Sequence, residues 1–260
     1  MDLRWFLVMG GAALALSSMS PIVAARRLGF FASALPHSAL LAVSLGYVLS
    51  RVLGLDPFAC SLLLSLPISY TFTFLLHRGV DAEIATSVFV AFTSSSSVAA
   101  MYLVLTRFPA EASLWSYILG DPLLVSWSEA LTILLLAALL TAAAVLVYEV
   151  EVMIGLDADF ARVSGVRVEL RDYLLTTMLT LASVGMLRVV GFVVQHVAIL
   201  LPAAIGTRVA RNARQLMLVS VTLSFLAGIL SVALASVVDM PPSAVYGLLL
   251  MAAYVLSLLR

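Results

Sequence analysis

The stretch ALTILLLAALLTAAAVLVY, residues 130–148, contains no Asp, Glu, Lys or Arg. Nine uncharged stretches of this kind make up most of the chain. They cover residues 5–25, 28–50, 57–76, 84–106, 130–148, 173–187, 189–207, 215–238 and 240–259. About 20 apolar residues in a helix cross the hydrocarbon core of a bilayer, because a helix pairs its own backbone groups. The sequence therefore predicts an all-α, polytopic helical membrane protein with about eight or nine spans, one of them short and broken.

The bulk composition agrees with this prediction. Hydrophobic residues make up 63% of the chain, charged residues 11%, and the mean hydropathy is +1.15. These values differ strongly from those of soluble domains, so we expect one transmembrane domain over residues 1–260. The formal net charge is zero, which argues against a nucleic-acid partner. The single cysteine, Cys60, lies in an apolar stretch and is interpreted as a small packing residue.

Every basic residue of the chain is arginine. A phosphate-binding loop of the Walker A type requires a lysine, so this chain carries no such ATPase site. Any ATP-driven activity would then depend on a partner protein. The pattern His-Glu-x-x-His of intramembrane metalloproteases is absent too, and we expect no catalytic role.

The arginines also predict an orientation in the cytoplasmic (plasma) membrane. One set of alternate loops holds ten of them: Arg26, Arg27, Arg78, Arg162, Arg167, Arg171, Arg208, Arg211, Arg214 and Arg260. The other side holds four. The positive-inside rule makes the ten-arginine side cytoplasmic, so with nine crossings the N-terminus lies outside and the C-terminus inside.

Several helix starts are visible in the sequence. Asp56-Pro57 and Asp121-Pro122 each place a capping acid before a proline at the first helical position. Residues 126–129 (SWSE) form a capping box before the fifth span, and 241–243 (PPS) begin the last. The serine run 94–97 indicates close helix packing rather than a polar path.

Polar groups inside a span are costly, and the first such group lies in residues 26–46. Helical spacing places Ser33, His37 and Ser44 within about 40° of one another on one face. Pro36 cannot donate to the carbonyl of Ala32, which frees an oxygen about one turn before the imidazole. These groups could hold a passing cation. Alternatively, His37 hydrogen-bonds a neighbouring helix at a kink.

A second polar group lies in residues 188–208. Gly191, Pro202 and Gly206 interrupt a short span that contains Gln195 and His196. Transporters build sites near the membrane midplane from broken helices with polar side chains. His196 could instead be an interhelical hydrogen-bonding group near the outer surface.

The longest predicted cytoplasmic loop covers about residues 149–172. Asp157 can cap a two-turn helix that Gly165 ends. On this helix Phe160 and Val163 share a face, with Asp159 and Arg162 beside them. Such an apolar knob suits docking into a groove of a partner protein, and a solvated surface helix is the alternative.

Together these segments resemble the membrane permease subunit of the ABC-type zinc/manganese/iron(II) metal-ion importer family. The resemblance covers residues 20 to 255 in order. The matching motifs are 26–31 (RRLGFF), 35–41 (LPHSALL), 119–124 (LGDPLL), 156–166 (LDADFARVSGV), 190–191 (VG), 200–204 (LLPAA) and 239–243 (DMPPS).

The resemblance implies a permease homodimer with a central path. Two cytoplasmic ABC ATPase subunits would lie below it and an extracellular or periplasmic metal-binding substrate protein above it. Alternating access would follow ATP binding, with Asp157, Asp159, Phe160, Arg162, Val163 and Gly165 forming the ATPase-coupling element. The cargo would be a transported divalent ion (zinc, manganese or iron(II)), and no cofactor would be bound permanently.

One departure from the family pattern concerns the metal site. The family carries Asp four residues before its His, whereas this chain has Ser33. Our hypothesis is that His196, with Gln195, compensates by facing His37, which favours zinc or iron(II) over manganese. A permease for a metal chelate such as a siderophore or haem, an ion-coupled secondary transporter and a scaffold protein are the alternatives.

Overall fold

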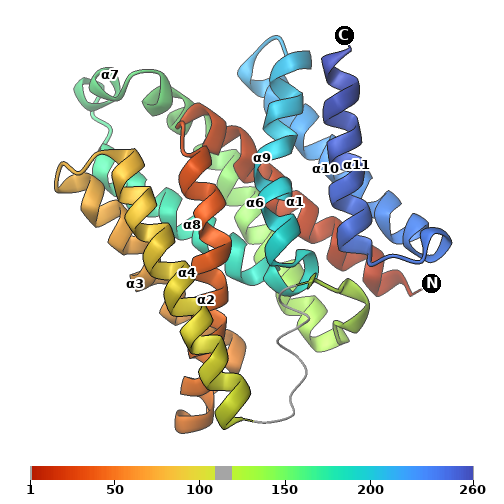
Figure 1. Cartoon of the computed structure of the whole chain (residues 1–260). Helices are drawn as coiled ribbons and strands as arrows, with labels where there is room; N and C mark the ends of the chain where they lie inside the picture. Colours follow the sequence, from red (N-terminus) through yellow and green to blue (C-terminus); the bar gives the residue numbers. More distant parts are fainter. Residues whose placement is uncertain (1, 109–118, 260) are drawn as a thin grey trace.

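The structure is a computed structural model that describes residues 2–108 and 119–259. Its elements are α1 Leu3–Ala25, α2 Gly29–Leu53, α3 Pro57–His77, α4 Ala82–Arg107, the 3-10 helix η1 Pro122–Leu124, α6 Trp127–Leu156, α7 Ala158–Val163, α8 Val168–Val190, α9 Phe192–Val209, α10 Ala213–Val238 and α11 Pro242–Leu258. Within the described residues all regular structure is helical, which confirms the predicted fold class (Figure 1).

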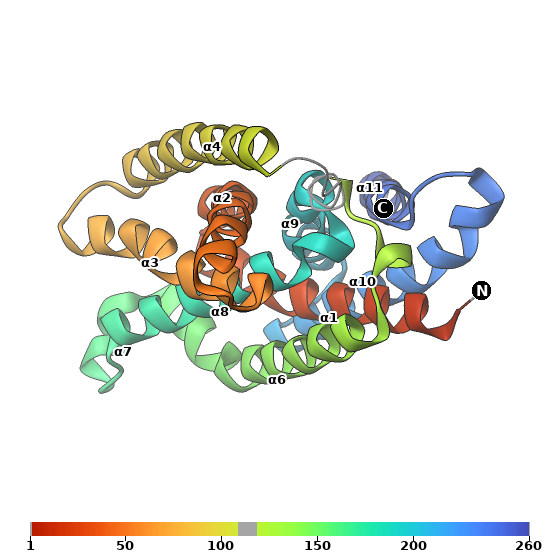
Figure 2. The same ribbon diagram turned by 90° about the horizontal axis from the view of Figure 1, so that it is seen from below.

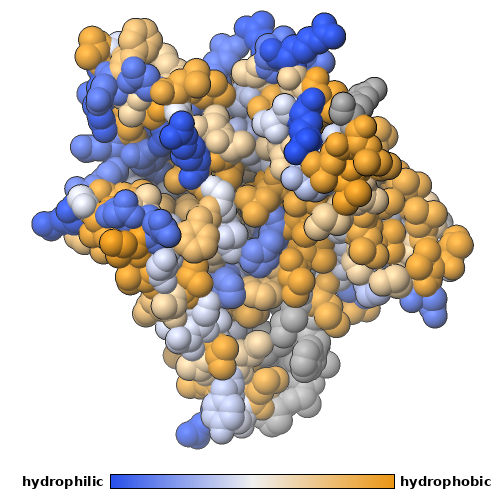
Figure 3. Space-filling view, turned by 45° about the horizontal axis from the view of Figure 1, so that its top comes forward, coloured by the Kyte–Doolittle hydropathy of each residue, from blue (hydrophilic) through white to orange (hydrophobic). Residues whose placement is uncertain are grey.

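Eight of these helices are long and apolar enough to cross a membrane, and α11 is a shorter apolar helix. The chain is therefore a multi-pass membrane protein. The short helix α7, the turn between α9 and α10 and the C-terminal end of α11 lie at the top of Figure 1. Hydrophilic surface gathers over this end, while apolar surface covers much of the flank (Figure 3).

Helix α1 forms the centre of the bundle. Its apolar window is 83% buried, the highest value among the spans, and it contacts α6, α8, α9 and α10. Figure 2 shows it between α6 on one side and α9 on the other. Gly10 and Gly11 permit close approach, since a Cβ on either would lie 2.9 Å from the side chain of Phe225 or Leu134.

The predicted caps are largely confirmed. Ser126 and Glu129 form a complete capping box at the start of α6, and Asp56 accepts a hydrogen bond from the amide of Ala59. Asp121 caps the 3-10 turn η1 rather than a span. Helix α6 continues to Leu156 and α8 starts at Val168, so the non-helical parts of the 149–172 region are confined to its middle.

A sharp break separates α8 from α9 at Gly191, which has φ of 81° and ψ of 157°. The backbone of residues 119–121 packs directly on the backbone at this break. A Cβ on Gly191 would lie only 2.5 Å from the amide nitrogen of Gly120. The amide of Asp121 donates to the carbonyl of Arg188 (3.0 Å), and the hydroxyl of Ser243 donates to the carbonyl of Gly120 (2.8 Å). The break is therefore clamped by the segment before η1 and by the start of α11.

Candidate functional site

His37 of α2 and His196 of α9 come together in the structure. Their ring centroids lie 6.1 Å apart with an interplanar angle of 77°. Phe192 sits beside both, with its centroid 4.8 Å from that of His37 and 5.6 Å from that of His196. Because zinc lies about 2.1 Å from each ligating ring nitrogen, two imidazoles on one ion have centroids roughly 5–6.5 Å apart. The observed spacing suits a shared ion.

Hydrogen bonds orient both imidazoles. Nδ1 of His196 lies 3.1 Å from the carbonyl oxygen of Phe192 and 3.2 Å from that of Val193. Carbonyls only accept, so Nδ1 carries the proton and Nε2 of the neutral ring keeps its lone pair. Nδ1 of His37 lies 2.9 Å from Oγ of Ser94 in α4. Metal-binding histidines are typically oriented by such a contact at the second nitrogen.

Ser94 was not among the residues predicted for the site. The serine run was interpreted as packing, and this holds for Ser97, which is 3% exposed and donates to the carbonyl of Ser94. The hydroxyl of Ser94 instead reaches His37. The only signal in the sequence was several hydroxyls on adjacent positions of an otherwise apolar helix.

The two serines predicted to accompany His37 on α2 donate their hydroxyl hydrogens to backbone carbonyls of the same helix. The hydroxyl of Ser33, one turn before His37, donates to the carbonyl of Phe30 (2.6 Å). Ser44 is fully buried and donates to the carbonyl of Leu40 (2.9 Å). A hydroxyl that donates its proton still keeps lone pairs for a cation, so Ser33 stays a candidate ligand.

Gln195 has a different environment from its neighbour His196. It is fully buried, and its Nε2 donates to the carbonyl of Ser183 (2.7 Å) while its Oε1 accepts from the Ser183 hydroxyl (3.1 Å). Both ends of the amide are therefore used to join α9 to α8. We assign Gln195 this positioning role and leave it out of the proposed ligand set.

The site is poor in charge. Among residues 2–108 and 119–259, no group of three or more His, Cys, Asp or Glu side chains could hold a metal ion. Two neutral imidazoles and nearby hydroxyls would bind a divalent ion weakly, because no carboxylate offsets its charge. Weak binding suits an ion that must leave again.

Two of the helices that carry these residues are incompletely covered. The apolar window of α4 is only 28% buried and that of α9 39%. Helix α4 lies at one edge of the bundle, with α2 next to it (Figure 2). Polar groups next to a face that contacts lipid are costly.

The short helix predicted between Asp157 and Gly165 is present. Asp157 accepts from the amides of Asp159 (3.0 Å) and Phe160 (2.9 Å) at the start of α7, and Gly165 follows its end with φ of 87°. Arg162 and Asp159 form an ion pair of 2.6 Å. Phe160 is 59% exposed and Val163 90%, so the apolar knob projects from the surface.

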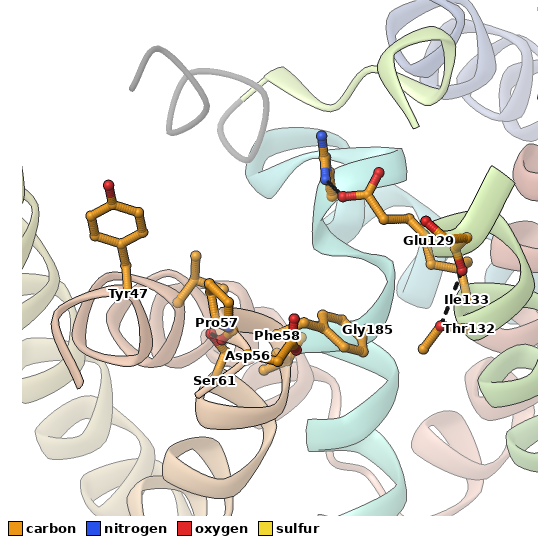
Figure 4. Close-up of a pocket in the computed structure, with 13 residues that line it drawn as sticks. Tyr47, Asp56, Pro57, Phe58, Ser61, Glu129, Thr132, Ile133 and Gly185 are labelled. Carbon is orange, nitrogen blue, oxygen red and sulfur yellow. Dashed lines mark hydrogen bonds and ion pairs between the residues drawn. The ribbon is translucent and has the colours of Figure 1, made fainter. Parts of the chain in front are cut away.

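A separate cavity of about 450 Å³ lies at the opposite end of the bundle, between α2 and α3 on one side and α6 and α8 on the other (Figure 4). Tyr47, Asp56 and Ser61 line the first side. Glu129, ion-paired with Arg188, lines the second. It does not contain either imidazole, so it is distinct from the histidine site.

Comparisons with known proteins agree with this architecture. A model described as the ABC 3 transport family matches residues 4–260. A curated protein of Thermotoga maritima, named "Probable metal transport system membrane protein", is 25% identical over 248 residues, which cover 94% of this chain and 84% of the relative.

Two solved structures share the fold. The first is PsaBC from Streptococcus pneumoniae in complex with Fab, with a TM-score of 0.81, 18% identity and coverage of 98% of this chain and 89% of that chain. The second is described as an inward-facing conformation of an ABC transporter assigned to the metal-chelate type, with a TM-score of 0.73, 14% identity and coverage of 98% and 84%. The family resemblance drawn from the sequence is confirmed by the match over nearly the whole length, and the chain belongs to the ABC 3 transport family.

Proposed function

We propose that this chain is the permease subunit of an ATP-driven importer for a divalent transition-metal ion, with His37 and His196 as ligands of the passing ion. The convergence of these two imidazoles from separate spans carries the proposal. The metal transport system named for the Thermotoga maritima relative supports the cargo class. Imidazole ligands favour zinc or iron(II) over manganese.

The rest of the machine would consist of partner proteins. ATP hydrolysis would be catalysed by cytoplasmic ABC subunits that receive the exposed Phe160 and Val163 of α7 in a groove. A metal-binding substrate protein would deliver the ion at the outer side of the cytoplasmic membrane. A second copy of this chain would cover the open side of α4 and α9, with the N-termini outside and the C-termini inside.

The decisive experiment measures ATP turnover by the permease reconstituted with its ATPase and substrate protein. Free zinc(II), iron(II) and manganese(II) are compared with a ferric siderophore and with haem. Stimulation by a bare divalent ion is the expected result, whereas stimulation by the chelates alone would support the metal-chelate alternative.

The ligand role is tested with His37→Ala and His196→Ala in the same system. Each variant should lose metal-stimulated turnover and uptake while keeping its assembly with the ATPase. Ser95→Ala is the matched control, because Ser95 is an exposed neighbour of Ser94 in the same serine run. Wild-type uptake by both histidine variants would refute the site.

A further inference from the structure

A cluster of charged side chains lies where α1, α3, α6 and α8 meet beneath α7. Arg26 follows the end of α1, Glu151 belongs to α6, Asp172 to α8 and His77 to the end of α3. Glu151 is fully buried although it was expected in a cytoplasmic loop. None of these residues takes part in the histidine site.

The two carboxylates compete for one guanidinium. Arg26 hydrogen-bonds Asp172 through Nη2, whereas its Nε lies 3.7 Å from Oε2 of Glu151, too long for a hydrogen bond. Within the described residues, three side-chain atoms here have no hydrogen-bond partner: both carboxylate oxygens of Glu151 and Nη1 of Arg26. A buried carboxylate without hydrogen bonds is unfavourable, and Nη1 of Arg26 is a nearby donor that lacks an acceptor.

The competing carboxylates belong to different arms of the coupling element. Glu151 lies on the α6 arm that leads into α7, and Asp172 lies on the α8 arm that leaves it. The α8 arm is joined to α3 by Tyr70–Thr177 and Thr73–Thr176 hydrogen bonds, both 2.7 Å. Movement of α7 would therefore displace one arm relative to the other at Arg26.

The α6 arm also rests directly on the end of α1. A Cβ on Gly155 would lie 2.6 Å from the carbonyl carbon of Ala25 and 3.1 Å from the amide nitrogen of Arg26. The turn after α1 is closed by the amide of Leu28, which donates to the carbonyl of Val23 (3.0 Å), with Arg27 at φ of 56°. Because the two backbones are in contact, the α6 arm and the turn that holds Arg26 have little room to move independently.

We propose that Arg26 is a two-position switch in the coupling mechanism. In the arrangement described here it binds Asp172, and in the other access state it binds Glu151 with full hydrogen bonds. The exchange carries the displacement of α7 to the end of α1, the central helix of the bundle. This proposal rests on the proposed function only for the existence of an ATPase that moves α7.

The test uses the two carboxylate variants as opposite traps. Glu151→Gln leaves Arg26 with Asp172 alone, and Asp172→Asn leaves it with Glu151 alone. Each variant therefore retains one ion pair at Arg26, and Asp172→Asn also replaces the carboxylate that lies 3.1 Å from Nε2 of His77. Glu149→Gln is the matched control, because Glu149 lies on the same helix, is exposed and pairs with Arg214 at the surface.

The measurement is the accessibility of a reporter cysteine in the complete ATPase complex. Ser33→Cys is introduced together with Cys60→Ser, and a charged methanethiosulfonate reagent is applied from either side of the membrane. Couplings of this kind typically change an equilibrium about 5–150-fold. The ratio of outside to inside labelling rates should therefore shift at least about fivefold, in opposite directions for the two variants, with the control unchanged.

A shift in the same direction for both variants, or an equal shift in the control, would overturn the proposal. If Glu151→Gln does not assemble, Glu151→Asp replaces it, since the shorter side chain withdraws the carboxylate without removing its charge. Its shift should have the sign expected for Glu151→Gln, and the opposite sign or no shift would also overturn the proposal. Labelling requires no metal but does require that Ser33 lines the path, so a loss of metal stimulation alone would leave this result intact.

Discussion

The clamp at the α8–α9 break predicts a large effect for a single methyl group. Gly191→Ala would place a side chain in a backbone region that is essentially restricted to glycine, at φ of 81° and ψ of 157°, which costs about 1–3 kcal/mol. The new Cβ would also lie 2.5 Å from the amide nitrogen of Gly120, and overpacking of this kind costs about 1–3 kcal/mol. We therefore expect Gly191→Ala to lower the free energy of unfolding by about 2–6 kcal/mol in total.

Gly54→Ala separates the two contributions. Gly54 also has a positive φ, of 68°, but a Cβ there would have open space within 4 Å. Gly54→Ala should therefore lower the free energy of unfolding by only about 1–2 kcal/mol, the cost of a left-handed backbone conformation for a residue with a Cβ. The apparent melting temperature of the purified chain in detergent, followed by intrinsic fluorescence, should therefore fall clearly further for Gly191→Ala.

Metal binding gives a second readout of the same variant. Gly191 immediately precedes Phe192, whose ring packs on both imidazoles, so displacement of the break moves His196 relative to His37. Loss of outer support for a metal ligand typically lowers affinity about 10–100-fold, and calorimetry with zinc should show this loss for Gly191→Ala alone. Equal melting temperatures and equal zinc affinities for the two alanine variants would refute the clamp.

Three further predictions concern single side chains. Ser94→Ala removes the hydrogen bond to His37 and should weaken zinc binding about 10–100-fold in calorimetry, while Ser95→Ala has no effect. Ser33→Asp adds a carboxylate one turn from His37 and should raise the affinity for divalent metal ions, including manganese. Unchanged affinities in competition titrations would contradict this. Phe160→Ala should weaken ATPase binding by about 2 kcal/mol in a pull-down titration without changing the melting temperature, because Phe160 projects from the surface.

The helices and several caps could be predicted from the sequence because their causes are local. Long uncharged stretches predict spans, and Ser126 with Glu129 carries its capping partners within four residues. The start and end of α7 are also set by nearby residues, the capping Asp157 and the terminating Gly165. Such features depend on neighbours along the chain, so the pattern alone is sufficient.

The site depended on contacts that no local pattern encodes. Whether His37 and His196 face one another is decided by how α2 packs on α9, and the sequence supplied only a hypothesis. Gln195 looked equivalent to His196, but helical geometry turns successive residues by about 100° and directs the amide to Ser183. Glu151 looked like a loop residue, because the guanidinium of Arg26, 3.7 Å away in the structure, lies far away in sequence.

The distribution of charge links the two regions to which we have assigned functions. Two ion pairs between helices lie at opposite ends of the bundle: Arg188 with Glu129 beside the cavity of about 450 Å³, and Arg26 with Asp172 near α7. Between them the histidine site offers neutral donors only. A divalent ion there would be held by lone pairs against the low dielectric rather than by opposite charge, so its residence depends on donor geometry. On the two proposals above, a small displacement of α9 would release the ion, and an input at α7 that passes through α1 to its neighbour α9 would control an ion that α7 never touches.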